Sequence, residues 1–270
     1  MKLLFLGDIV GKVAREKVIN SIPILRKKLS LDFVVVNGEN AAGGFGITSQ
    51  ICNQFFDSGI DVITGGNHSW DQAEIVEYIE NEPRLLRPLN HVMGTPGRGH
   101  NVFNTYDGKK ILIINLIGQV FMKPNENPFL SIENCLKSSN LGKTVDVIFV
   151  DFHAEATSEK MAMAQFLDGR VSAVIGSHQQ IPTADSQILD KGTAYQTDAG
   201  MCGDYNSVIG MQKEVPINRF LGKISKDRFR PASGEATICG VVIETSEITG
   251  LAKKITPLRV GGRLIEEWPN

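Results

Sequence analysis

The chain lacks the features that mark disulfide-rich, membrane or secreted proteins. Its four cysteines are far apart and form no C-x-x-C pair, so we expect free thiols: Cys52, Cys135, Cys202 and Cys239. No apolar run approaches the ~18 residues of a membrane span. The N-terminal apolar run stops at Gly7-Asp8, which is too short for a signal-peptide core. We therefore expect a cytoplasmic protein with no membrane partner.

An excess of charge of either sign is also missing. The 270 residues include 28 Lys and Arg against 30 Asp and Glu, a net charge of −2. This balance, without a basic and aromatic stripe, argues against a long nucleic acid as partner. Two nucleotide-binding motifs are absent as well. Only three residues separate Gly7 from Gly11, Val13 replaces the P-loop hydroxyl, and no G-x-G-x-x-G follows the first apolar run.

What the chain does have is a regular alternation of apolar β-rich runs and helical periodicity. Continuous apolar runs predict strands buried on both faces, at 2–7, 32–37, 61–64, 110–116, 145–150 and 171–175. Spacing and capping residues predict helices at 13–29, at 48–58 from a Thr48 cap, at 70–81, and from a Ser158 cap to about 167. Strands that alternate with helices indicate an α/β fold.

The last third of the chain is richer in strands, which we expect at 192–197, 235–244 and 247–259. We expect these strands to complete a second sheet in the same domain. Gly, Pro and Asn predict loops at 93–101 and 123–128. No linker, repeat or low-complexity segment interrupts the chain, so residues 1–270 are expected to form a single domain.

Five of the apolar runs end in a small or polar cluster that carries a metal-binding side chain: Asp8, Glu39, Asn67, His153 and His178. Loops at the carboxyl ends of parallel strands converge on one crevice, so these five side chains could share a pocket. Taken singly, Asp8 fits a turn or helix cap, Asn67 a turn, and His153 a satisfied core histidine. Glu39 is costly to bury unless it is paired. Five such residues in succession favour a site.

This combination of side chains suits divalent cations. Carboxylates, an amide oxygen and imidazoles together match Mn, Fe, Zn or Ni rather than Ca or Mg alone. Two ions roughly 3.5–4 Å apart can share a hydroxide and clamp a phosphate. Glu39 is the candidate for a carboxylate that reaches both ions. His68, next to Asn67, is the candidate proton donor for the leaving oxygen.

Other polar residues nearby receive simpler interpretations. Trp70 and Asp71 are expected to pack against and cap the next helix. His91 and His100 lie in loop-like sequence and are expected to be solvated. The glycine-rich stretch 41–48 (AAGGFGIT) is either a flexible loop or a rim over the pocket.

With these residues in view, the chain resembles the calcineurin-like metallophosphoesterases, and within them the YmdB-like branch of bacterial phosphodiesterases. The superfamily pattern has five blocks in order: D-x-H, G-D-x-x-D, G-N-H-[DE], a lone His and G-H-x-H. At the corresponding places this chain has G-D-I, G-E-N, G-N-H-S-W-D, D-F-H-A-E and G-S-H-Q-Q. Ile9-Val10 supplies no His and Glu39 replaces the bridging Asp, and the YmdB-like branch shares both departures. It also shares G-D-I-V-G, N-G-E-N-A-A-G-G-x-G-I-T and a late G-M-x-G-x-Y, here 200–205.

The resemblance implies a four-layer αββα sandwich, with two mixed β-sheets packed face to face and helices outside. It implies a phosphodiesterase for small substrates such as 2′,3′-cyclic nucleotides. Two divalent ions per chain are implied, Fe or Mn first and Mg or Zn as alternatives. Asp8 would bind the first metal and Glu39 would bridge both. The second metal and the phosphate would be held by the remaining residues: Asn67, His153 and His178 for the metal, Asn40 and His68 for the phosphate.

One position departs from the branch, because Gln180 stands where the last metal-binding His of G-[ST]-H-x-H is expected. A neutral Gln carbonyl is a poorer ligand for borderline ions, so the first metal should be weaker, or a harder and more labile ion such as Mn or Mg, unless water fills the position. The departure leaves open a regulatory nucleotide-binding protein without turnover. A phosphomonoesterase or nuclease on the same fold, and a homo-oligomeric state, also stay open.

Overall fold

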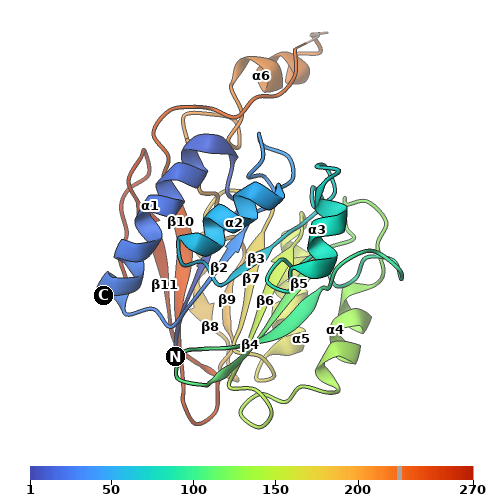
Figure 1. Cartoon of the computed structure of the whole chain (residues 1–270), viewed down its shortest axis with the longest axis vertical. Helices are drawn as coiled ribbons and strands as arrows, with labels where there is room; N and C mark the ends of the chain where they lie inside the picture. The colour runs from blue at the N-terminus through green and yellow to red at the C-terminus, as the bar shows by residue number, and fades with distance from the viewer. Residues whose placement is uncertain (224–226, 270) are drawn as a thin grey trace.

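Two mixed β-sheets packed face to face form the centre of the molecule, as a computed structural model of residues 1–223 and 227–269 shows (Figure 1). The first sheet has the order β11-β10-β1-β2-β3. Its strands are β1 (Lys2–Leu6), β2 (Phe33–Asn37), β3 (Val62–Thr64), β10 (Ile238–Thr245) and β11 (Ala252–Val260). The second sheet has the order β4-β5-β6-β7-β9-β8. Its strands are β4 (His100–Asn104), β5 (Lys110–Ile117), β6 (Val147–His153), β7 (Ala173–Ser177), β8 (Gln187–Ile188) and β9 (Ala194–Gln196).

The inner strands of both sheets run parallel. β1, β2 and β3 are parallel in the first sheet, and β5, β6, β7 and β9 in the second, while the outer strands β4, β8, β10 and β11 pair antiparallel with their neighbours. Each parallel group therefore presents its carboxyl ends, and the loops that follow them, at one edge of its sheet.

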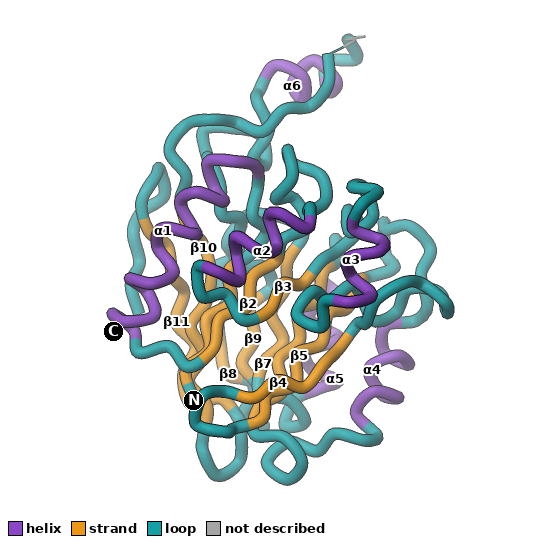
Figure 2. Tube along the Cα trace, viewed as in Figure 1, coloured by secondary structure: helices purple, strands orange, loops and turns teal. Residues whose placement is uncertain are grey.

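Helices cover the outer face of each sheet, as Figure 2 shows. Apolar side chains of α1 (Gly11–Leu29), α2 (Ser49–Asp57) and α3 (Ile75–Asn81) share one core cluster with the first sheet. α4 (Pro128–Leu136) and α5 (Thr157–Leu167) share another with the second sheet. α6 (Glu214–Phe220) stands off the body at the top of Figure 1.

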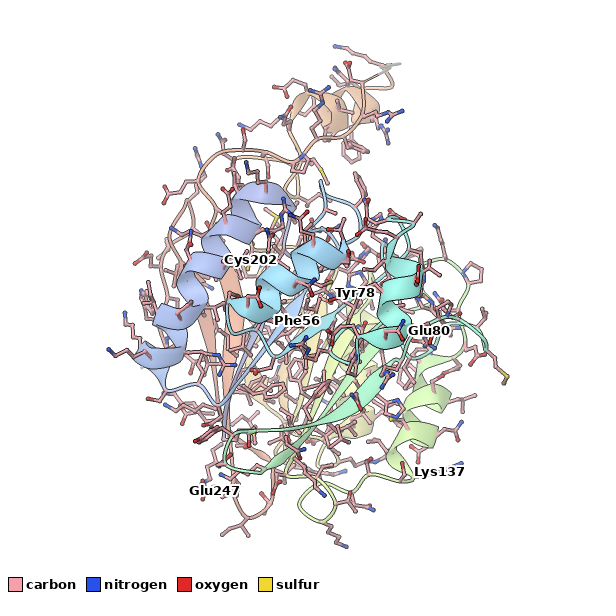
Figure 3. The ribbon with its side chains drawn as sticks, in the orientation of Figure 1. Phe56, Tyr78, Glu80, Lys137, Cys202 and Glu247 are labelled. Carbon is pink, nitrogen blue, oxygen red and sulfur yellow. The ribbon has the colours of Figure 1, made fainter. Side chains whose placement is uncertain are left out.

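A third core layer fills the space between the sheets. Leu3, Phe5 and Val35 come from the first sheet, and Ile113 and Phe149 from the second. The rings of Phe5 and Phe149 lie 5.1 Å apart between their centroids, and side chains occupy the space between the ribbons (Figure 3). The order helix, sheet, sheet, helix confirms the four-layer αββα architecture.

The expectation that the last strands complete a second sheet was wrong for two of them. β10 pairs antiparallel with β1, with Leu4 opposite Val242, and β11 pairs with β10, so both extend the first sheet. Only β9 joins the second sheet, beside β7. β10 covers the edge of β1 that would otherwise expose unpaired backbone groups, and hydrophobic patterning does not reveal which edge a late strand covers.

Several boundaries differ from the sequence-based expectation. Residues 100–104 form β4, although 100 and 101 were expected in a loop. α5 begins at Thr157 after Ala156, so Ser158 lies inside the first turn and does not cap the helix. α3 begins at Ile75 and not at 70. The Thr48 cap is confirmed, since its hydroxyl accepts a hydrogen bond from Ile51 N at 3.3 Å.

All four cysteines are buried free thiols, as expected. Within the described residues, no helix combines the length and the hydrophobicity needed to cross a membrane.

Candidate metal centre

The five metal-competent side chains expected at strand ends lie together in the structure. Asp8 follows β1, Glu39 follows β2 and Asn67 follows β3, while His153 ends β6 and His178 follows β7. The two sheets therefore contribute to one site from adjacent edges. Residues 170 positions apart in sequence come into contact there, because the backbone N–H of His178 donates to Asp8 Oδ2 at 2.9 Å.

His153 lies at the centre of the group. Its Nε2 lies 3.0 Å from Glu39 Oε1, 3.0 Å from Asn67 Oδ1 and 3.1 Å from His178 Nδ1. Ligand atoms of Glu39, His153 and His178 all lie within 4.8 Å of one another. Two imidazole nitrogens and two oxygens thus face a common point.

Hydrogen bonds fix which nitrogen of each histidine faces inward. His153 Nδ1 lies 2.9 Å from Ser177 Oγ, which in turn donates to Asp151 Oδ1 at 2.6 Å. His178 Nε2 lies 3.0 Å from Glu155 Oε2. Nδ1–H of His153 and Nε2–H of His178 therefore serve these outer acceptors, and the opposite nitrogens are directed into the group. A partner of this kind is typical of metal-binding histidines.

Asp151 is a buried carboxylate that sequence reasoning did not single out. Besides Ser177, its donors are the Thr64 hydroxyl at 2.5 Å and the Asn37 amide at 3.0 Å, both on the first sheet. Asp151 is on the second sheet, so this network ties the two sheets together directly behind His153. Its only sequence signal was the position directly before Phe152-His153 at the end of an apolar run.

Two buried oxygens near this group have no hydrogen-bond donor among the described residues: Asp8 Oδ1 and Gln180 Oε1. Gln180 Nε2 donates to Asn40 Oδ1 at 3.0 Å, so the amide orientation leaves the Gln180 oxygen without a partner. Buried acceptors without donors are rare in folded proteins. A bound cation would satisfy both oxygens.

The loop after β7 holds two residues in the left-handed backbone region. His178 has φ 95° and Gln180 has φ 66°, which non-glycine residues seldom adopt. Asp198 supports this loop, because its Oδ2 accepts hydrogen bonds from Gln179 N at 2.9 Å and from Lys160 Nζ at 3.0 Å. Lys160 also donates to Gln179 Oε1 at 3.1 Å.

Burial and mutual charge set the protonation of the group. Burial raises the pKa of Asp8 to about 8; the charge of His153 acts against the rise and that of Glu39 adds to it. Burial also acts to raise the pKa of Glu39, but His153 lowers it to about 2. Burial acts to lower the pKa of His153, but Glu39 raises it to about 9. Burial and the charge of His153 lower the pKa of His178 to about 3. The cluster thus holds a positive charge between its carboxylates, where a cation can replace a proton.

His68 lies at the border of the group and the open pocket. Its backbone N–H donates to Glu39 Oε2 at 3.0 Å, and its Nδ1 lies 2.7 Å from Asp71 Oδ2. The expectation that Asp71 caps the next helix was wrong, since α3 begins four residues later and Asp71 pairs with His68 instead. Trp70 packs against the apolar cluster that α1, α2 and α3 share with the first sheet.

The two other histidines differ from each other. His91 is half-buried, with Nδ1 2.8 Å from Asn125 Oδ1 and its ring 6.1 Å from that of Trp70, so the expectation that it is solvated was wrong. Burial lowers the pKa of His91. His100 is exposed on β4.

The glycine-rich stretch after Glu39 forms a hydrogen-bonded rim. Asn40 Nδ2 donates to Gly44 O at 2.9 Å, and Gly43, Gly44 and Gly46 have positive φ. Gly44 has φ 92°, which L side chains rarely adopt, and a Cβ there would also meet the end of the Met211 side chain, so a glycine is favoured. A cavity of about 610 Å³ opens in front of the group, and its polar wall consists of residues expected from the sequence: Glu39, Asn40, His68, His178 and Gln180.

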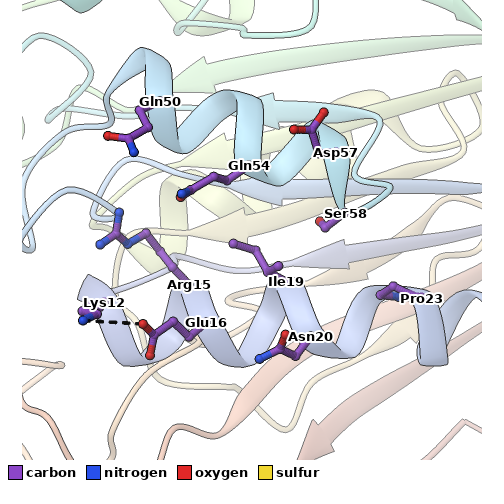
Figure 4. A pocket seen from close by; sticks show the side chains of 10 residues that line it. All are labelled: Lys12, Arg15, Glu16, Ile19, Asn20, Pro23, Gln50, Gln54, Asp57 and Ser58. Atoms are coloured by element: carbon purple, nitrogen blue, oxygen red, sulfur yellow. Dashed lines mark ion pairs between the residues drawn. The ribbon is translucent and has the colours of Figure 1, made fainter.

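A second cavity of about 670 Å³ lies between α1 and α2 (Figure 4). Most of its lining residues are polar, and they include the Lys12–Glu16 ion pair at 3.7 Å. None of its lining residues belongs to the group around His153. The cavity beside the candidate metal ligands is therefore the first one, of about 610 Å³.

The donor set fits divalent cations. Imidazole nitrogens from His153 and His178 stand beside carboxylate and amide oxygens, a combination suited to Mn, Fe or Zn. The donor-free oxygens of Asp8 and Gln180 add to this fit.

A model of the YmdB-like protein family matches residues 4–258. The chain belongs to the YmdB-like family. This YmdB-like chain is 45% identical to the 2′,3′-cyclic-nucleotide 2′-phosphodiesterase of Bacillus subtilis (strain 168), over 94% of this chain and 95% of that protein. The crystal structure of a hypothetical protein from Thermus thermophilus matches it with a TM-score of 0.89, 38% identity and coverage of 99% and 100%. A structure described as a novel phosphatase from Mycoplasma pneumoniae matches with a TM-score of 0.89, 35% identity and coverage of 100% and 95%.

Proposed function

We propose that this YmdB-like chain is a metal-dependent phosphodiesterase whose substrates are small phosphodiesters of the 2′,3′-cyclic nucleotide class. The observation that carries the proposal is the cluster of Glu39, His153 and His178 ligand atoms within 4.8 Å, at the wall of a cavity of about 610 Å³. The B. subtilis relative, at 45% identity over most of both chains, supports the reaction and the substrate class.

Two divalent ions would be held by this site, Fe or Mn in the first place and Mg or Zn as alternatives. Asn67, His153 and His178 would supply donors for one ion. Asp8 and Gln180 would supply donors for the other, and Glu39 would serve both. When bound, such ions supply a Lewis acid that lowers the pKa of water and offsets charge on the phosphate.

The remaining residues act on the substrate directly. The amide of Asn40 and the ring of His68 line the cavity and would contact the phosphate. Asp71 accepts from Nδ1 of His68, which leaves the proton at Nε2 of the protonated ring for transfer to the leaving oxygen. The edge-on contact of the Phe45 ring, 5.0 Å between centroids, restricts the ring orientation of His68.

The first test replaces Glu39, the carboxylate that would serve both ions. Glu39→Gln should lower kcat on 2′,3′-cyclic AMP with added Mn by about 10³-fold or more, the scale of losing a group that organises transition-state charge stabilisation. Circular dichroism should show an unchanged fold. The matched control, Glu77→Gln on the exposed face of α3, should leave kcat unchanged. Full activity of Glu39→Gln would refute the assignment.

A regulatory nucleotide-binding protein without turnover is the second candidate. The observation in its favour is the neutral amide of Gln180 at a position next to the donor group. Tight binding of 2′,3′-cyclic AMP without hydrolysis, in protein loaded with Mn or Fe and checked by elemental analysis, would select this candidate. Turnover would exclude it.

A further inference from the structure

The cavity in front of the metal centre has two chemically different sides. The side described above is polar and faces the ligand cluster. The other lining residues come from the rim, from α6 and from the segments before and after it, and they are apolar apart from Arg219, among them Phe45, Met211, Pro216, Phe220 and Phe229. The volume of about 610 Å³ lies in the range of sites for small molecules, about 300–1,000 Å³. One ligand can therefore touch both sides at once.

Two of the aromatic rings of the apolar side, Phe45 and Phe229, are supported from behind. Phe45 and Phe229 pack on a small core that contains the buried Met211. The guanidinium of Arg219 lies 4.0 Å from the centroid of the Phe229 ring. Phe220, on α6, also lines the cavity and is 90% exposed. Supported aromatic rings beside an open apolar face form a surface on which a flat ligand can stack.

We propose that this apolar side binds the base of the nucleotide whose cyclic phosphate lies at the metal centre. The proposal rests on the proposed function and adds a base-binding subsite to it. Bases stack on aromatic side chains and on arginine whatever their hydrogen-bonding edges are. Arg219 is the single charged side chain among the lining residues of this side, so hydrogen-bond readout of the base is limited. Purines should therefore bind better than pyrimidines, with little discrimination between adenine and guanine.

The test compares 2′,3′-cyclic AMP with the 2′,3′-cyclic phosphate of methyl riboside, which lacks a base. Phe220→Ala and Phe229→Ala should each raise KM for the nucleotide about tenfold relative to KM for the base-free substrate, the scale of losing one base–aromatic stack. Phe229→Trp keeps an aromatic ring and should leave the ratio of the two KM values as in wild type. The control Tyr106→Ala removes an aromatic ring that is fully exposed in the turn before β5, at the opposite end of the strands, and should leave the ratio unchanged.

If the alanine variants change KM equally for both substrates, so that the ratio of the KM values stays as in wild type, the base subsite is overturned. Absence of hydrolysis of either substrate by the wild-type protein would instead overturn the proposed function. Saturation-transfer NMR with adenosine then decides on the subsite without catalysis. Transfer to H2 and H8 in wild type that Phe229→Ala abolishes supports it, and absence of transfer in wild type refutes it.

Discussion

At the scale of single residues, the orientation of His153 depends on a neighbour with no metal-binding role of its own. Ser177 Oγ lies between His153 Nδ1 at 2.9 Å and Asp151 Oδ1 at 2.6 Å. Ser177→Ala removes this acceptor and frees the ring to change tautomer. We expect Mn affinity, measured by isothermal titration, to fall about 10- to 100-fold, the usual effect of losing such a partner.

The buried serine directly before β7 provides the control for loss of a buried hydroxyl. Ser172 Oγ accepts from Ile148 N at 3.1 Å, at the amino end of β6 and away from the site. Ser172→Ala should cost about 1 kcal/mol of unfolding free energy and leave Mn affinity unchanged. Equal Mn affinities in the two variants would show that Ser177 has no part in metal binding.

Gln180 allows a gain of metal affinity at one position. Among the described residues its Oε1 has no donor, and its backbone has φ 66°, a conformation in which His is enriched among non-glycine residues. Gln180→His would replace a neutral oxygen with an imidazole, a better ligand for borderline ions. We expect the ions retained per chain after chelator dialysis to rise by about one, as counted by elemental analysis.

The exposed Gln50 on α2 supplies the comparison for that substitution. Gln50→His introduces the same imidazole outside the site and should retain as little metal as wild type. Two tightly held ions in wild type after dialysis would contradict a weak position at Gln180.

The sequence was sufficient to name the residues that converge, since each follows an apolar run and parallel strands place such residues together. Their partners were not predictable in the same way. The contact between Asn37 and Asp151 joins residues 114 positions apart on different sheets. Only the packing of the two sheets determines that contact, and no local pattern records it. The pairing of Asp71 with His68 was missed because the start of α3 was placed too early.

At the scale of elements, a buried ion pair connects α5 to the segment after β9, and that segment in turn supports the loop after β7. Lys160 and Asp198 are fully buried, and Asp198 also holds the backbone of Gln179 between the two left-handed residues. Lys160→Met leaves the carboxylate buried without its cation. We expect about 3–5 kcal/mol less unfolding free energy in urea titrations, together with reduced phosphodiesterase activity as the loop loses its support.

The double variant Lys160→Met/Asp198→Asn separates charge burial from loop support. It removes both charges, so it should recover much of the lost stability, while activity should stay low. If Lys160→Met alone has the unfolding free energy of the wild type, the ion pair does not stabilise the fold.

Strand and helix positions were predictable where hydrophobicity was continuous, and less so elsewhere. β4 alternates between exposed and half-buried residues at the edge of its sheet, so it lacked the apolar run that marked β5 and β6. β10 had a clear strand pattern, yet its partner β1 lies more than 230 residues earlier in the chain. Long-range antiparallel pairing is decided by which edge is left uncovered, and the strand's own sequence does not encode it.

At the scale of the whole molecule, the site joins both sheets and concentrates buried charge, so cation binding should stabilise the entire fold. The pKa of His153 is raised to about 9 and that of Asp8 to about 8, so both are mostly protonated at pH 6, and cations must displace those protons. At pH 8, about half of the Asp8 carboxyls have lost their proton while His153 keeps most of its own, so the competition is weaker than at pH 6. At Mn concentrations near 100 times Kd, about 2.7 kcal/mol is gained, which raises Tm by roughly 5 °C. Calorimetry should show this shift at pH 8 and a smaller one at pH 6. In Glu39→Gln the shift should be lost at both values, and an equal Mn shift in that variant would show that the ion binds elsewhere.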